Sequence, residues 1–193
     1  MPINEQCSIR LPAWVQPWLD ARKDRFDSED GRMGFVIDLA RENVRMETGG
    51  PFGAAVFDLA EQALISVGVN LVTASGLSMA HAEMVALSLA QESLGDWDLA
   101  RHGELSLVTS CEPCAMCFGA VPWSGVRSMV CGARKEDAER AGFDEGDKPT
   151  NWADSLRQRG IEVTENVLPD RAANVFHFYR QQGGVIYNPG NDK

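Results

Sequence analysis

Hydrophobic residues recur along this chain at two different spacings. In segments 31–48 and 78–94 they return every three or four residues, which is the spacing of one buried helix face. Segments 52–58 and 63–70 are instead rich in apolar and β-branched residues, and a short polar connection separates them. The first two segments therefore predict amphipathic helices, and the second two predict a β-hairpin.

The chain after residue 94 continues with further strands and helices. The pattern predicts strands over residues 105–109, 128–132 and 161–167 and helices over residues 112–121, 135–141, 152–159 and 170–181. A hairpin followed by such elements predicts one mixed, five-stranded sheet with helices on both faces. The expected fold class is therefore α/β, a three-layer α/β/α sandwich.

The two ends of the chain lack this regular pattern. Pro2, Pro12 and Pro17 interrupt helical periodicity near the start, where we expect only a short helix near residues 12–25. We therefore predict an N-terminal extension over residues 1–30, a main domain over residues 31–181 and a C-terminal tail over residues 182–193.

Composition and charge narrow the class of protein. The 193 residues are 44% hydrophobic, as expected for one globular domain. Lys and Arg number 18 against 28 Asp and Glu, so the formal charge is −10, which disfavours a nucleic-acid partner. Neither a leader segment nor an apolar run of membrane-spanning length is present in the sequence. We therefore expect a cytoplasmic protein with no membrane partner.

The cysteines indicate a metal or redox site. The chain has five, an odd number, and three of them lie within seven residues at Cys111, Cys114 and Cys117. In a reducing compartment such clustering favours metal binding or redox chemistry over a disulfide framework.

Two short motifs, each at an expected helix start, suggest which metal. His81 and Glu83 open one helix, and a Pro-Cys-x-x-Cys segment with Cys114 and Cys117 opens another. Cysteines three residues apart share one helix face, so both sulfurs can reach one zinc ion. Cys111 and Cys114 form an overlapping pair, but a proline suits the first turn of a helix, which leaves Cys111 in the strand or turn.

The number of ligands separates a catalytic zinc from a structural one. A structural zinc has four protein ligands, whereas a catalytic zinc keeps three and leaves the fourth position to water. His81, Cys114 and Cys117 supply three, and Glu83 is the nearby base. Taken alone, the cysteines could be a redox pair or an inert buried pair. Together the two motifs are the signature of zinc-dependent nucleobase deaminases.

Several further segments carry a resemblance to a known family. They are GGPFGA at 49–54, Asn70, HAE at 81–83, TSCEPCAMC at 109–117, Trp123 and AGFDE at 141–145. With these segments the chain resembles the cytidine-deaminase-like superfamily, and within it the bacterial guanine deaminases, from about residue 31 to 146.

This resemblance implies a reaction and a set of residues. One zinc ion per chain activates a hydroxide that converts guanine to xanthine and ammonia, and Glu83 shuttles the protons. Asn70 is expected to hold the ring oxygen, Phe52 and Trp123 to pack the ring, and the backbone near Ala82 to hydrogen-bond it.

The resemblance also implies a second acid. Guanine deaminases carry a carboxylate in a Phe-Asp-acid segment, where Glu145 stands in this chain, with Asp144 beside it as a further substrate contact. A carboxylate suits guanine because the ring N1–H and the 2-amino group are adjacent donors. By composition alone, this segment would be an acidic loop in solvent.

The resemblance also implies a role for the C-terminal tail. Related enzymes close the site with a C-terminal segment, in some cases swapped between subunits, so Tyr187 is expected over the site. We expect a homodimer that binds a small purine base.

Three alternative functions remain open at this point. A tRNA adenosine deaminase shares both motifs, but it would need a basic groove for the anticodon arm. A deaminase of cytosine, a pterin or a triazine would meet a ring with similar edges. A zinc-stabilised binding module would need neither Glu83 nor a free ligand position.

Overall fold

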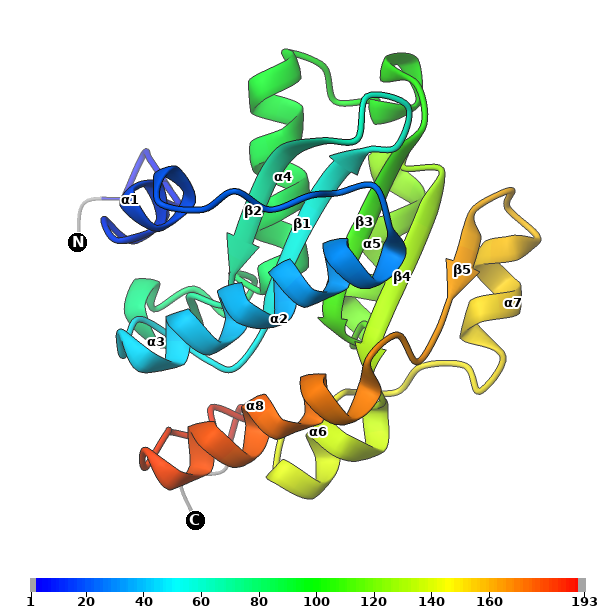
Figure 1. Ribbon diagram of the computed structural model, residues 1–193. Helices are drawn as coiled ribbons and strands as arrows, with labels where there is room; N and C mark the ends of the chain where they lie inside the picture. The colour runs from blue at the N-terminus through cyan, green and yellow to red at the C-terminus, as the bar shows by residue number, and fades with distance from the viewer. Residues whose placement is uncertain (1–2, 191–193) are drawn as a thin grey trace.

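A five-stranded mixed sheet forms the centre of the protein in a computed structural model that describes residues 3–190 (Figure 1). The strands are β1 (Gly53–Asp58), β2 (Ala63–Val69), β3 (Leu105–Cys111), β4 (Ser128–Ala133) and β5 (Glu162–Thr164), in the order β2-β1-β3-β4-β5. Strand β1 runs antiparallel to β2 and β3, whereas β3, β4 and β5 are parallel.

Helices cover both faces of this sheet. The helices of residues 3–190 are α1 (Val15–Asp20), α2 (Glu29–Arg45), α3 (Val72–Ser75), α4 (Ala82–Leu94), α5 (Ala115–Ser124), α6 (Lys135–Ala141), α7 (Trp152–Arg157) and α8 (Pro169–Gln181), with a 3-10 turn at Leu99–His102. Helices α2 and α8 pack on one face, and α4 and α5 lie on the other (Figure 1). The three-layer α/β/α sandwich is confirmed.

The burial of the central strands explains their sequence. Every residue of β3 and of β4 is buried, because helices cover both faces of these strands. A strand buried on both sides has no solvent face and reads as a continuous run of small and apolar residues. One hydrophobic cluster lies on each side of the sheet.

The strand directions bring three helix starts to one edge of the sheet. Strands β2, β3 and β4 point the same way, and the helices α4, α5 and α6 follow them along the chain. Helix N-termini therefore collect beside the carboxyl ends of these strands, which is where open α/β sheets bind ligands.

Several element boundaries differ from the prediction. The first helix covers Val15–Asp20 instead of residues 12–25, and the last strand has three residues instead of the seven in 161–167. The helix expected from residue 78 begins at Ala82, after a turn in which Gly76 has φ +68°. The short elements α3 and Leu99–His102 were not predicted, since a single turn is too short to show a period.

The helix expected over residues 112–121 begins three residues later, at Ala115. Pro113 was expected in its first turn, but it precedes the N-cap residue Cys114. Glu112 is still tied to the sheet, because its N–H donates to the Ala133 carbonyl at 2.8 Å. Because Glu112 is still paired with the sheet, the helix begins at a later residue than expected. Cys111 ends the strand, as expected.

The N-terminal segment packs on the main domain. Val15 is buried in the core cluster, the Trp14 indole donates to Thr48 Oγ1 at 2.9 Å, and Phe26 lies 4.9 Å from Phe57 between ring centroids. The division at residues 31 and 182 stays a prediction, and residues 1–2 and 191–193 of the predicted end segments lie outside the described residues. Across residues 3–190, no helix has the length and apolarity that crossing a membrane requires.

Candidate active site

Three metal-ligand side chains meet between the starts of α4 and α5. The His81 Nδ1 atom lies 3.4 Å from Cys114 Sγ and 3.6 Å from Cys117 Sγ. His81 is the N-cap residue of α4 and Cys114 is that of α5, while Cys117 is one turn into α5. The predicted set is therefore brought together, and the three ligand atoms all lie within 4.8 Å of one another.

These spacings fit one zinc ion. With zinc–sulfur bonds of about 2.3 Å and zinc–nitrogen bonds of about 2.1 Å, a tetrahedral site separates nitrogen from sulfur by about 3.6 Å. The two observed distances of 3.4 and 3.6 Å agree with that value. The ligand set thus fits a single zinc per chain, with three protein ligands.

The charge state of the sulfurs also suits a cation. Hydrogen bonding from Cys117, with a further contribution from His81, lowers the pKa of Cys114 to about 4. The Cys117 thiol has a raised pKa, because it donates to the Cys114 sulfur and is buried. A bound cation would displace the Cys117 proton and hold both sulfurs as thiolates.

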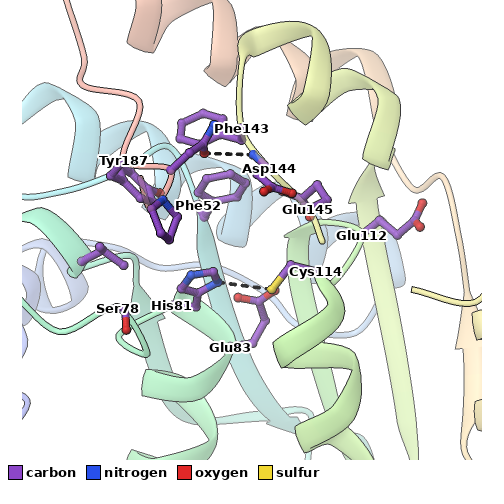
Figure 2. Close-up of a pocket in the computed structure, with 13 residues that line it drawn as sticks. Phe52, Ser78, His81, Glu83, Glu112, Cys114, Phe143, Asp144, Glu145 and Tyr187 are labelled. Carbon is purple, nitrogen blue, oxygen red and sulfur yellow. Dashed lines mark hydrogen bonds between the residues drawn. The ribbon is translucent and has the colours of Figure 1, made fainter. Parts of the chain in front are cut away.

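Glu83 lies beside this cluster, in the first turn of α4 and almost fully buried. Burial raises the pKa of its carboxyl, and the negative charge of Cys114 adds to the effect. A raised pKa makes the protonated form of this acid more accessible, which suits a group that takes up and releases a proton. Figure 2 shows its carboxyl group beside Cys114, within the pocket.

The acidic segment after α6 turns its side chains alternately inward and outward. Phe143 and Glu145 are buried, with Glu145 only 5% exposed, whereas Asp144 is exposed at the mouth of the pocket. Burial raises the pKa of Glu145 to about 8, with further contributions from Cys114 and Glu83. Its composition alone would suggest a loop in solvent, but two of its side chains are buried in the structure.

Aromatic rings and the C-terminal tail form the opposite wall of the pocket. Phe52 and Phe143 lie 5.0 Å apart between centroids, and Tyr187 lies 5.2 Å from Phe143 (Figure 2). The Asn188 side chain accepts from Asp144 N–H at 3.0 Å and donates to the Gly142 carbonyl at 2.8 Å. The tail therefore contacts the pocket of its own chain.

The remaining predicted substrate-binding residues are Asn70, Ala82 and Trp123, and they differ from one another in burial. Asn70 is buried beside Phe52, whose carbonyl accepts from its N–H at 3.0 Å, and its own Oδ1 accepts from Val72 N–H at 3.2 Å. Ala82 is buried at the start of α4. Trp123 is 84% exposed on α5 and does not line the pocket. Its expected contact with the ring stays a prediction that this arrangement of one chain does not support.

Some pocket residues were not predicted as site residues. These are Val72, Ser78, Glu112, Phe143, Asn188 and Pro189. Glu112 and Phe143 stand inside the motifs quoted above, so their motif neighbours could have indicated them. Val72 is the first residue of α3, Ser78 lies between α3 and α4, and the other two belong to the tail. The sequences of these segments carry no signal of a site.

The fold and the site together define a zinc-dependent deaminase. A family model described as the cytidine and deoxycytidylate deaminase zinc-binding region matches residues 29–133, more than half of the chain. The chain belongs to this family.

Individual relatives agree with this assignment. The guanine deaminase of Bacillus subtilis is 37% identical over 71% of this chain and 88% of its own. A guanine deaminase structure from Nitrosomonas europaea is 44% identical, covers 94% of this chain and 100% of its own, and has a TM-score of 0.85. The tRNA-specific adenosine deaminase of Haemophilus influenzae is 28% identical over 85% of this chain and 90% of its own.

Proposed function

We propose that this protein hydrolyses guanine to xanthine and ammonia. The observation that carries the proposal is Glu145, a buried carboxyl group facing a pocket that also contains His81, Cys114 and Glu83. Guanine presents two adjacent N–H donors, and one carboxylate can accept both. The similarity to proteins named guanine deaminase supports the same substrate.

Glu83 is the proton carrier in this proposal. When bound, zinc supplies the Lewis acidity that makes water a nucleophile at neutral pH. The Glu83 carboxylate removes a proton from the attacking water and donates it to the ring nitrogen. It then removes the second proton from the hydroxyl group added to the ring carbon and donates it to the 2-amino group, which leaves as ammonia. Its burial raises the carboxyl pKa, which suits a group that must alternate between both forms.

Glu145 and the aromatic wall orient the ring. Without a bound base, burial holds the pKa of Glu145 at about 8, so the carboxyl is largely protonated at neutral pH. Two N–H donors from a bound ring would favour the carboxylate and lower this pKa. Phe52 and Phe143 supply apolar surface for a flat heterocycle, and Asn70 is proposed to hold the ring oxygen.

The tail closes the site over the bound base in this proposal. Tyr187 and Asn188 contact the 142–144 segment of the same chain, and these contacts require no exchange of tails between subunits. Closure excludes water other than the nucleophile and strengthens electrostatic interactions within the pocket.

The test of the substrate is an ammonia-release assay with zinc-loaded protein. Guanine, cytosine, adenine, a pterin and a triazine are compared, and inosine formation is measured with tRNA. We expect guanine to have the highest kcat/KM. Inosine formation in tRNA with guanine left intact would overturn the proposal, and it would contradict the expectation from the charge of −10.

A pair of variants tests the role of the second acid. Glu145→Ala is expected to lower kcat/KM for guanine by about ten- to a hundredfold, because two donors of the ring lose their acceptor. Asp144→Ala removes the neighbouring carboxylate, which is exposed, and is expected to have a smaller effect. Wild-type kcat/KM in both variants would remove the main support for guanine.

We also propose a homodimer and a cytoplasmic location. Met116 and Trp123 are exposed on the same face of α5, seven residues apart, which supports an interface on that helix. Buried, unpaired cysteines support a reducing compartment. Trp123→Ser should shift the sedimentation equilibrium toward monomer, whereas Trp97→Ser, at another exposed tryptophan, should not.

A further inference from the structure

Lys148 is a buried cation next to the pocket that the proposed mechanism does not use. Its side chain is only 2% exposed, although it follows a glycine and an aspartate in a polar segment. The ammonium group donates to Glu112 Oε1 at 2.5 Å and to the Pro113 carbonyl at 2.6 Å, and it lies 4.7 Å from the centre of the Trp152 ring. A lysine buried with this set of partners is held in one position.

The partners of Lys148 belong to the segment that carries the zinc ligand Cys114. Glu112 lines the pocket, and Pro113 directly precedes Cys114. Glu112 is itself fixed to the end of β4, since its N–H donates to Ala133 and its Oε2 accepts from the Lys135 N–H at 3.3 Å. Lys148 therefore binds a segment that cannot easily move.

A second contact joins the same two segments at Glu145. The Ala115 N–H, at the start of α5, donates to the Glu145 carbonyl at 2.9 Å. Gly146 follows with φ +68°, and a Cβ there would lie 3.1 Å from Ala115 Cβ, so the two backbones are in close contact. The backbone of Glu145 and the side chain of Lys148 thus attach residues 145–148 to residues 112–115 at two points.

We propose that Lys148 is a positioning residue: its ammonium group holds residues 145–148 against residues 112–115 and so fixes the Glu145 carboxyl relative to Cys114. This inference rests on the proposed deamination of guanine. The buried positive charge also acts on Glu145 directly, because it lowers the carboxyl pKa against the larger effect of burial. A carboxyl displaced by a fraction of an ångström would no longer meet both donors of the ring.

The test is a double-mutant cycle. Lys148→Met keeps an unbranched apolar side chain but removes the charge that lies over the Trp152 ring, and it is expected to lower kcat/KM for guanine about ten- to a hundredfold with zinc content unchanged. In a Glu145→Gln background the same substitution should change kcat/KM by less than about threefold, because the lysine acts through that carboxyl. Lys135→Met is the matched control, since the Lys135 side chain pairs with Glu139 and not with Glu112.

Hydrogen exchange provides a readout that needs no substrate. Backbone amides of residues 143–148 should exchange faster in zinc-loaded Lys148→Met than in the wild type, and exchange in the Lys135→Met control should be unchanged. Unchanged exchange, or an equal loss of kcat/KM with and without Glu145, would overturn the inference. Faster exchange in a protein that does not turn over guanine would instead contradict the proposed function alone.

Should Lys148→Met fail to fold, Glu112→Gln replaces it in the same cycle, because it removes the other charge of the pair.

Discussion

The hydroxyl group of Tyr187 occupies the space directly over Gly50. A Cβ built on Gly50 would lie 2.1 Å from Tyr187 Oη and 2.8 Å from two ring carbons. The Tyr187 hydroxyl is buried and has no hydrogen-bond partner among the described residues. Gly50, which directly precedes Pro51, therefore leaves room for Tyr187, a residue 137 positions later in the chain.

This relationship predicts that Gly50→Ala acts through the tail. The new methyl group must displace Tyr187 and with it the closure of the pocket, so we expect kcat/KM for guanine to fall about tenfold or more. Tyr187→Ala should cause a similar loss, and the double variant should be no worse than either single one, because both remove the same contact. Fully additive losses in steady-state kinetics would contradict the shared mechanism.

Glu83→Gln should separate zinc binding from turnover. The amide retains the size of the side chain but cannot carry protons, so kcat should fall by several orders of magnitude while zinc content stays near one per chain. Glu92→Gln, at an exposed position of the same helix, is the control and should match the wild type. Retention of more than about a tenth of wild-type kcat would exclude Glu83 as the proton carrier.

Loss of either sulfur ligand should remove the metal. Cys114→Ser and Cys117→Ser leave two good ligands of the three, and we expect zinc content and turnover to be lost together. Cys7→Ser is the matched control, since Cys7 is exposed. Elemental analysis measures the outcome, and normal zinc content in both ligand variants would refute the assignment.

Glu145 should make the folded protein less stable as the pH rises. Its pKa is about 8 in the folded state because of burial, against a reference value of 4.5, so the unfolded chain loses this proton first. The contribution of this group to the free energy of unfolding is fully present below the pKa of the unfolded chain. It is lost progressively as the pH rises to about 8. Glu145→Gln does not titrate. Urea unfolding of zinc-free protein should therefore show a free-energy difference between variant and wild type that grows in favour of the variant from about pH 6 to about pH 8. A constant difference would mean that the folded carboxyl is already ionised at pH 6.

The sequence by itself determined the sheet and singled out three candidate metal ligands. Strand and helix periods are local properties, and a hairpin followed by parallel strands and helices allows few arrangements. His81, Cys114 and Cys117 were predictable for the same reason, because Pro-Cys-x-x-Cys places two sulfurs one helical turn apart and the strand directions bring the two helix starts together.

Only the tertiary structure decided the rest of the pocket. Composition suggested a solvated loop for the acidic segment around Glu145, yet Glu145 and the nearby Lys148 turn inward because the backbone of this segment docks on the start of α5. Trp123 was expected beside the ring and lies on the surface, since α5 turns Cys117 to the metal cluster and Trp123 away from the pocket. Such contacts join residues far apart in the chain, and whether a side chain faces inward depends on the partner that packs against it. The local spacing of residues contains no information about that partner. The burial of Lys148 and the position of Tyr187 over Gly50 could therefore be found only in the folded chain.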